Sequence, residues 1–540
     1  MNQKKYDVFT GITKKQTYIS LLLILSVGII VRLYFLPSSL PLTLDSFVYF
    51  VYSLALVEQG PFPTDYLRVN FGWSTFLSTF FIFFRDSEML ELMNVQRVVS
   101  ILISVGTIIP IYYLAKIFFR KETSILAAAV FIFEPHIIMN SINGGTIPLF
   151  ILLVTLVIFF SFYQKRYHFV FAFICTALAA FVRYEGLLLL LPLIVAIFLE
   201  KNYLRKKILN FGISFTVFFL VMIPISLIGY NAGEVICNSC LPDFLNEIPI
   251  IAHIFSGGDF VTQIAYSNEL GPNEKFAKME QNEGLTVFLF DSIIGYIKFF
   301  IFVSIPILIL GLLFSMIFIS KKITRNRIVV VIFSIILSIS GLYAFGRGIE
   351  ETRYIFPLIP IMILFSLTSF ERLLTKKYVK KIGVCLIIAT LCVSITFIGF
   401  QKSDYQQEKE IYKSALFIVD NAKGVNLEPG GRFMKIAEME NNWKQLPLTD
   451  DNGKIFVETK RLSINNYHTV EKYLQDSQKF GLTHIVVYNE NDKKFLTEVF
   501  YNEKEYSYLT KVYDSSILGH KKYIKIFEID FEQFGHSILK

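Results

Sequence analysis

The chain has 540 residues, of which 54% are hydrophobic and only 18% are charged. Soluble globular proteins carry fewer apolar and more charged residues, so this composition excludes a water-soluble fold. The formal net charge of +8 does not indicate a nucleic-acid partner, because the Lys and Arg residues stand in short clusters between apolar runs, a pattern that reports membrane topology.

Apolar runs long enough to cross a bilayer follow one another up to about residue 400. A crossing helix needs about 20 apolar residues. This length predicts a polytopic α-helical membrane protein with about eleven transmembrane helices, at 18–36, 94–119, 124–139, 147–163, 169–182, 187–199, 208–230, 292–319, 328–345, 355–371 and 382–400. No small-residue cleavage site follows the N-terminal lysines, so the first run is predicted to be a retained helix.

The charge pattern decides whether the short apolar segment 71–84 crosses the membrane. If it stays on one side, all the basic clusters face the same compartment: Lys14–Lys15, Arg120–Lys121, Lys165–Arg166 and the loops 201–207, 321–327 and 375–381. The positive-inside rule then predicts a multi-pass plasma-membrane protein with a cytoplasmic N-terminus. It also predicts that 71–84 is an interfacial or re-entrant helix within a long outer loop, from about 37 to 93.

The composition becomes charged and polar after Gln401, and no later run approaches crossing length. We therefore predict a multi-spanning membrane domain at 1–401 and a soluble extracytoplasmic α/β domain at 402–540. The expected elements of this second domain are helices at 411–422 and 469–481 and strands at 483–488 and 523–529.

Asp45 directly follows the first predicted span, in LPLTLDSFVYF. A carboxylate at the water interface can accept a proton from an acceptor hydroxyl, and partial burial among apolar neighbours would raise its pKa toward the range of a general base. The structural alternative is an N-cap of a helix beginning at Ser46. The two roles are compatible.

Arg183 and Glu185 interrupt a long apolar stretch, AAFVRYEGLLLL. Ionisable groups at membrane depth are costly and usually face a cavity or a partner group. The planar fork of Arg183 suits a lipid phosphate. The alternative is that the two charges pair in a short outer turn between two helices.

Charged residues also crowd the outer end of the predicted span 355–371, namely Arg347, Glu350, Glu351 and Arg353. Arg353 stands just before the apolar run, where it can reach a phosphate or pyrophosphate at the interface. The alternative is an exposed loop with weak mutual ion pairs. Glu134, beside Pro135 and His136, adds polar groups near the outer end of the span 124–139.

The sequence gives little support for a metal site, a redox site or one of the common hydrolase or nucleotide-binding motifs. Cys237 and Cys240 have the spacing of a redox or half-zinc motif, but no second pair exists and the histidines are dispersed. We therefore predict no metal site, with a disulfide as the alternative for the two cysteines. The sequence contains no P-loop, GxSxG or HExxH motif.

The order of these features resembles the GT-C superfamily of membrane glycosyltransferases, especially the branch of protein O-mannosyltransferases and lipid A aminoarabinose transferases. The resemblance covers most of residues 18–400. Asp45, Tyr49, Ser53 and Gly60 match an acidic residue after the first helix, followed by a tyrosine and small residues. The family often has an acidic pair here, whereas Ser46 follows Asp45, so the resemblance implies a single base rather than a metal ligand. Three further stretches are similar: EPHIIMNSINGGTIPLFILL, FVRYEG and TRYIFPLIP.

The resemblance implies transfer of a sugar from a polyprenyl- or dolichyl-phosphate donor to a protein, lipid or glycan acceptor outside the cell. Asp45 would be the catalytic base, and a direct displacement would invert the sugar carbon. The donor would be bound by Arg183, Glu185, Arg353 and Arg347, with support from Tyr49, Glu134, Glu350, Glu351 and Tyr354. No metal or other cofactor is required, because guanidinium groups can neutralise the phosphate; a divalent metal is an open alternative that the sequence does not support.

Three other interpretations stay open. A lipid-linked sugar flippase or polymerase explains many helices without Asp45, although transporters usually show repeated halves or broken helices at matching positions. An oligosaccharyltransferase of the same superfamily should carry a Trp-Trp-Asp motif in its outer domain, whereas Trp73 and Trp443 are the only tryptophans. A non-catalytic membrane scaffold is the third.

Overall fold

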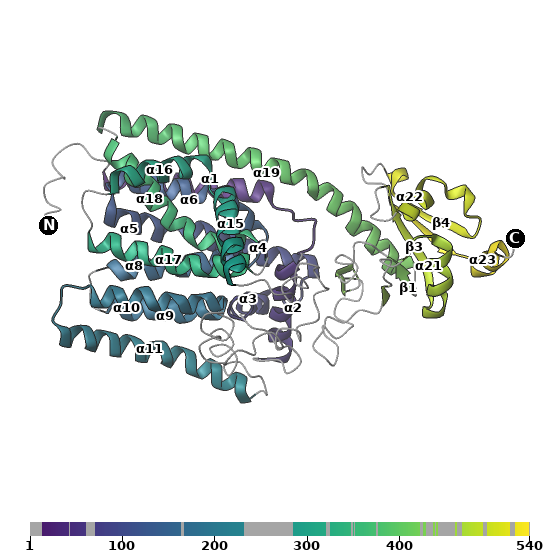
Figure 1. Cartoon of the computed structure of the whole chain (residues 1–540), viewed down its shortest axis with the longest axis horizontal. Helices are drawn as coiled ribbons and strands as arrows, with labels where there is room; N and C mark the ends of the chain where they lie inside the picture. Colours follow the sequence, from purple (N-terminus) through teal and green to yellow (C-terminus); the bar gives the residue numbers. More distant parts are fainter. Residues whose placement is uncertain are drawn as a thin grey trace. The chain divides into compact units, whose positions relative to one another are not determined.

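The computed structural model (Figure 1) describes most of the chain, in the ranges 13–42, 44–60, 71–163, 167–231, 285–319, 324–346, 349, 351–373, 376–421, 425–427, 436–437, 439–440, 460–461, 467–489, 494–518 and 524–538. The described residues fall into two compact units. One lies within Met1–Leu36, Gln59–Thr79 and Gln96–Ile398, and the other within Pro37–Glu58, Phe80–Val95 and Gly399–Lys540. The predicted domain boundary after residue 401 stays a prediction.

Helices dominate the chain up to residue 421. In chain order they are α1 (Lys14–Phe35), α2 (Leu44–Gln59), α3 (Gly72–Phe81), η2 (Ile82–Phe84), α4 (Met89–Gly106), α5 (Ile108–Phe118), α6 (Lys121–Ile132), α7 (Pro135–Ile142), α8 (Ile147–Phe162), α9 (His168–Val182), η3 (Tyr184–Leu189), α10 (Leu190–Phe198), α11 (Leu204–Asn231), α15 (Leu285–Val303), α16 (Pro306–Ile319), α17 (Arg325–Gly346), η5 (Thr352–Tyr354), η6 (Phe356–Leu358), α18 (Ile359–Leu373) and α19 (Lys376–Asn421). In the first unit, α8, α9 and α11 lie side by side (Figure 1).

Six of the described helices are long and apolar enough to cross a membrane, and two bent pairs raise the number to eight. The pairs are α6 with α7, bent by 50°, and α15 with α16, bent by 118°. Each of the predicted spans coincides with one of these helices, with a bent pair, or with a shorter apolar helix. The chain is therefore a helical membrane protein, while the count of eleven crossings stays a prediction.

The basic residues of the first unit that the structure describes in these clusters lie at one end of its helices, which we call the basic end. Four contacts join helix ends there: Arg120 Nε donates to Glu371 Oε1 at 2.6 Å, Lys207 Nζ donates to the Phe198 carbonyl at 2.7 Å, Arg325 Nη2 donates to the Ala196 carbonyl at 3.5 Å, and His168 Nε2 lies 3.6 Å from Glu200 Oε1. A side-chain hydrogen bond between Thr17 and Tyr112 places the Lys14 end of α1 at the same end. The helices thus have the common sidedness that the sequence predicts.

The segment 71–84 begins away from the basic end. Trp73 Nε1 donates to the Gly144 carbonyl at 3.1 Å, and Gln96 Nε2 donates to the same oxygen at 2.8 Å. Gly144 has φ of 72°, a conformation that favours glycine, in the turn between α7 and α8. Trp73 and Gln96 therefore both contact the turn between α7 and α8, while the assignment of 71–84 as a non-crossing segment stays a prediction.

A small mixed sheet near the C-terminus belongs to the second unit. Its strands run in the order β2-β1-β3-β5-β4, with β1 parallel to β2 and β3, and β5 antiparallel to β3 and β4. The elements are β1 (Val425–Leu427), β2 (Lys460–Arg461), α21 (Val470–Ser477), η7 (Gln478–Phe480), β3 (Leu482–Tyr488), α22 (Lys494–Tyr501), η8 (Glu503–Glu505), β4 (Leu509–Asp514), η9 (Ser515–Leu518), β5 (Ile524–Ile529) and α23 (Phe531–Ile538).

Both predicted strands are confirmed: 483–488 lies in β3 and 523–529 in β5. Both predicted helices are confirmed as well: 469–481 corresponds to α21 with η7, and 411–422 to the last part of α19. The sequence missed β4, whose residues are mostly exposed and lack a clear apolar alternation because the strand lies at the edge of the sheet. It also missed the short helices α22 and α23.

His484 makes the stability of this sheet depend on pH. The side chain is buried on β3, opposite Glu528 of β5. Burial lowers the pKa of His484 below its usual 6.5, and the Glu528 carboxylate opposes this shift. The folded sheet therefore binds fewer protons than the unfolded chain between the two pKa values, so its free energy of unfolding falls as the pH drops below about 6.5.

We expect amides of β3 in the full-length protein to lose protection from hydrogen exchange between about pH 7.5 and 5.5, after correction for intrinsic exchange rates. His484→Asn should weaken this dependence, whereas the exposed His468→Asn should keep it. Equal corrected protection at both pH values in the unmodified protein would refute the role of His484.

Candidate functional site

Arg183 lies at a break between two apolar helices, where α9 ends and η3 begins. Its backbone is extended, with φ of −152° and ψ of 128°, and its carbonyl accepts the Gly186 N–H at 2.8 Å. The Arg183 side chain is buried, and its Nη2 donates to Glu185 Oε1 at 2.6 Å. The predicted pairing of the two charges in a turn is therefore confirmed.

Gly186 allows this turn to pack directly against α9. A Cβ at position 186 would lie 2.5 Å from Ala179 C and from Ala180 N, which are backbone atoms. We expect Gly186→Ala to displace η3, with the Arg183–Glu185 pair, at a cost of about 1–3 kcal/mol of stability. The measurement is thermal unfolding of the purified protein in detergent. The control is Gly212→Ala in α11, where nothing lies within 4 Å of the added Cβ, and equal melting of the two variants would contradict the close packing.

The second arginine of the site comes from a distant part of the sequence. Arg353 lies in η5 beside Tyr354, it is half-buried, and it forms an ion pair with the exposed Glu351. The Arg353 guanidinium carbon lies 5.5 Å from the centre of the Tyr354 ring, and that of Arg183 lies 5.6 Å from the same centre. The Arg183 guanidinium also lies 5.9 Å from the centre of the Phe150 ring.

The arrangement places two guanidinium groups around one aromatic ring at the end opposite the basic end. Guanidinium groups next to an aromatic ring keep their planar hydrogen-bonding forks, which match the oxygens of a phosphate or carboxylate. The site can therefore bind an anion. Each arginine already faces one carboxylate, so a bound anion would share or replace these ion pairs.

Glu134 caps the second half of the bent pair α6–α7. Its Oε2 accepts the Ile137 N–H at 2.6 Å, and its Oε1 lies 2.8 Å from His136 Nδ1. Glu134 is fully buried, and His136 packs among the rings of Phe302, Phe356 and Phe397 at 5.1–5.7 Å between centres. Pro135 at the first turn explains the bend, because proline is accepted there but cannot continue a preceding helix.

Arg32 is the main residue that the sequence analysis missed. It is fully buried in α1, and its guanidinium donates to the Ile132 carbonyl and the Gly28 carbonyl at 3.0 Å, to Ser141 Oγ at 3.0 Å and to Ser104 Oγ at 3.2 Å. The Ile132 carbonyl is freed by the end of α6, so Arg32 satisfies a backbone group at the bend. A single arginine inside an otherwise apolar span was the signal that would have found it.

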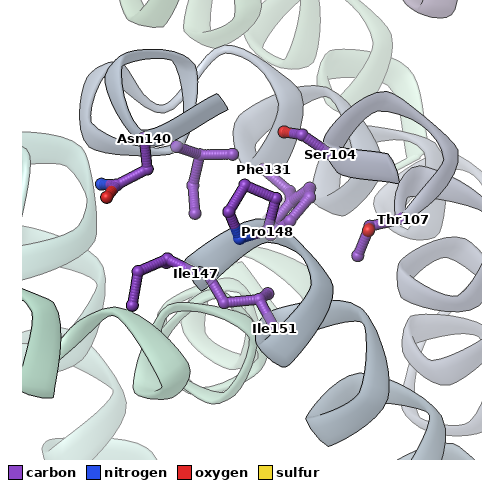
Figure 2. Close-up of a pocket in the computed structure, with 8 residues that line it drawn as sticks. Ser104, Thr107, Phe131, Asn140, Ile147, Pro148 and Ile151 are labelled. Atoms are coloured by element: carbon purple, nitrogen blue, oxygen red, sulfur yellow. The ribbon is translucent and has the colours of Figure 1, made fainter. Parts of the chain in front are cut away.

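A narrow pocket lies beside this bend, between α4, α6, α7 and α8. Figure 2 shows its lining, with Asn140 on one side of Pro148 and Ser104 and Thr107 on the other. The Asn140 amide donates to the His136 carbonyl, Thr107 donates to Ile103, and Ser104 accepts from Arg32. These polar groups bond to the protein itself, and the remaining lining is apolar, so the pocket offers no evident chemistry. None of the predicted site residues lines it.

Asp45 lies in the second compact unit, in the first turn of α2. The helix begins at Leu44, so Asp45 stands inside the first turn rather than at the N-cap. The predicted partial burial was wrong: Asp45 is exposed, because side chains of a first turn point beyond the start of their own helix. Tyr49 and Ser53, one and two turns later, are buried, and Ser53 Oγ donates to the Tyr49 carbonyl at 2.6 Å.

Several predicted residues lie outside the described part of the chain, namely Arg347, Glu350, Cys237 and Cys240. Within the described part, no three His, Cys, Asp or Glu side chains gather in a way that could hold a metal ion. Ser46 stands where a second carboxylate would be needed beside Asp45. The prediction that no metal takes part stays a prediction.

Comparison with known proteins gives one family match. A family model described as dolichyl-phosphate-mannose-protein mannosyltransferase matches residues 88–228. This segment contains Glu134, Arg183 and Glu185, but neither Asp45 nor Arg353. No curated protein sequence matches the chain.

Solved structures share the fold over most of the chain. The apo oligosaccharyltransferase of Archaeoglobus fulgidus aligns with 90% of this chain and 71% of its own, at 12% identity and a TM-score of 0.53. ArnT from Cupriavidus metallidurans aligns in its apo state with 96% of this chain and 98% of its own, at 11% identity and a TM-score of 0.51. Its form bound to undecaprenyl phosphate aligns with 94% and 97%, at 11% identity and a TM-score of 0.51.

At these identities the structural likeness concerns the fold. The family-model match over residues 88–228 and the shared fold both agree with the resemblance seen in the sequence. The resemblance predicted from the sequence is therefore confirmed.

Proposed function

We propose that this chain, which resembles the GT-C membrane glycosyltransferases in sequence and fold, transfers a sugar from a polyprenyl-phosphate carrier to an acceptor at the outer face of the membrane. The acceptor is a protein, lipid or glycan. The basic end faces the cytosol in this proposal, as the positive-inside rule requires, so the two-arginine site faces outward. We place the C-terminal domain on the outer side as well, as the sequence predicts.

One observation carries the proposal: Arg183 and Arg353, distant in sequence, flank the same Tyr354 ring. Both stand next to apolar helices, where the phosphate of a membrane-embedded lipid would lie. ArnT from Cupriavidus metallidurans was solved bound to undecaprenyl phosphate, and we propose a carrier of the same kind for this site.

The proposed chemistry is one displacement at the anomeric carbon of the sugar. The acceptor oxygen forms a bond to this carbon while the bond from the carbon to the phosphate oxygen breaks. Asp45 takes the proton of the acceptor hydroxyl, and the carrier leaves as a phosphate monoester whose extra negative charge the arginines stabilise. Arg347 keeps the donor-binding role that the resemblance implies. The supporting roles stay with Tyr49, Glu134, Glu350, Glu351 and Tyr354.

The direct test is transfer by the purified protein in vesicles that contain undecaprenyl-phosphate-linked sugars, followed by mass spectrometry of glycans and glycolipids. A missing sugar in cells that lack the gene would identify reaction and acceptor together. Movement of the labelled carrier across the vesicle membrane without a new glycosidic bond would instead favour a flippase.

We expect Arg353→Gln to weaken the binding of undecaprenyl phosphate by about tenfold to a hundredfold, because one charge-assisted hydrogen bond to an anion contributes about 1.5–3 kcal/mol. The affinity is measured by microscale thermophoresis or by retention of labelled lipid in detergent, neither of which relies on tryptophan fluorescence. Arg205→Gln is the matched control, since Arg205 is exposed at the basic end. Equal affinity of the two variants would remove Arg353 from the site.

A further inference from the structure

The second carboxylate oxygen of Glu185 has no partner in the described part of the chain. Glu185 Oε1 accepts the hydrogen bond from Arg183, whereas Oε2 is buried and makes no hydrogen bond. The Glu185 side chain is only 7% exposed. A buried acceptor of this kind is unfavourable unless a donor completes it.

The position of this oxygen is fixed by the turn that carries it. Glu185 lies on η3, which Gly186 holds against the backbone of α9, and its other oxygen is tied to Arg183. Glu185 also interacts electrostatically with Tyr354, the ring that both arginines flank. The unpaired oxygen therefore belongs to the same group of side chains as the proposed phosphate site.

A carboxylate does not help to bind a phosphate, because the two negative charges repel each other. The missing partner must instead be a hydrogen-bond donor. In a sugar phosphate, the hydroxyl on the carbon next to the anomeric carbon is the sugar donor nearest to the phosphate. An arginine that binds the phosphate would thus bring this hydroxyl close to a residue two positions away on the same turn.

We propose that Glu185 Oε2 accepts a hydrogen bond from the hydroxyl next to the anomeric carbon of the sugar on the carrier. This inference rests on the proposed function. Arg183 then recognises the phosphate and Glu185 recognises the sugar attached to it, so that the turn distinguishes a loaded carrier from an empty one. Glu185 is a specificity-determining residue in this arrangement, which differs from the phosphate-binding role that the sequence predicted.

The test compares the binding of four lipids to the full-length protein: undecaprenyl phosphate and its conjugates with glucose, mannose and 2-deoxyglucose. Glucose and mannose differ only in the configuration of the hydroxyl in question, and 2-deoxyglucose lacks it. We expect the unmodified protein to bind the better of the two hexose conjugates about tenfold to a hundredfold more tightly than the 2-deoxy conjugate.

Glu185→Gln, which keeps a neutral acceptor, should reduce this preference, and Glu185→Met, which has no comparable acceptor, should abolish it. Both variants should still bind empty undecaprenyl phosphate, which shows that they are folded. Glu200→Gln at the basic end is the control and should keep the full preference.

Two results would overturn the inference alone. The first is equal binding of hexose and 2-deoxy conjugates by the unmodified protein, which is expected if a water molecule donates to Oε2 instead. The second is an undiminished preference for the hexose conjugate in Glu185→Met. Failure of the unmodified protein to bind any of the four lipids would overturn the proposed function and this inference together.

Discussion

Asp45→Asn is expected to lower the rate of sugar transfer by about 10²- to 10⁴-fold, the range that a general base contributes. The amide has nearly the shape of the carboxylate but cannot take the proton of the acceptor hydroxyl. Asp45 is exposed in the first turn of α2, and asparagine keeps its size and one hydrogen-bond acceptor. The rate should therefore fall while the thermal stability and the binding of undecaprenyl phosphate stay unchanged.

The measurement is transfer in reconstituted vesicles, with melting in detergent and lipid binding measured on the same preparations. Glu91→Gln is the matched control, since Glu91 is likewise a carboxylate in the first turn of a helix of the same compact unit. Transfer by Asp45→Asn at a rate near that of the control would exclude Asp45 as the base and would direct the search to another carboxylate.

Arg32→Leu is expected to destabilise the membrane unit by about 3–5 kcal/mol, the cost of breaking a buried charged network by removing one partner. Four acceptors lose their donor, and one of them is the Ile132 carbonyl at the bend between α6 and α7. Arg32 also interacts with the buried Glu134, which would be left without this positive charge. The bend itself should therefore loosen.

Thermal unfolding in detergent checks this expectation, with Arg32→Lys as an intermediate case, because an ammonium group has only three donors and no planar fork. Leu33→Ala is the control on the neighbouring position, where the side chain is 51% exposed. An unchanged melting temperature for Arg32→Leu would mean that the hydrogen bonds of Arg32 contribute nothing to holding the bent helices.

The two bent helix pairs, α6–α7 and α15–α16, are relevant to the flippase interpretation. Broken helices occur in transporters at matching positions of repeated halves. The two bends observed here differ, with angles of 50° and 118°, and the first is explained locally by Pro135 capped by Glu134. The freed carbonyls of this bend are satisfied inside the protein, by Arg32 at Ile132 and by Ser394 at Phe133. The α6–α7 bend therefore has a structural explanation that needs no transport.

The sequence by itself determined the class of the protein, because hydropathy and charge act locally. An apolar run of sufficient length specifies a membrane helix wherever it occurs, and clusters of Lys and Arg mark one end of the bundle. The same local patterns located the turn at Arg183–Glu185 and the strands β3 and β5. They also predict that 71–84 does not cross.

The tertiary structure decided which of these residues meet. Arg183 and Arg353 are brought to one ring because η3 and η5 both pack against α17, and no local pattern encodes this contact. Arg32 donates hydrogen bonds to Ser141 and Ile132, which are 109 and 100 residues away in the sequence. Trp73 and Gln96 both donate to the Gly144 carbonyl. Buried polar groups must find partners inside the protein, and where these partners lie depends on how the helices pack rather than on the sequence around each group.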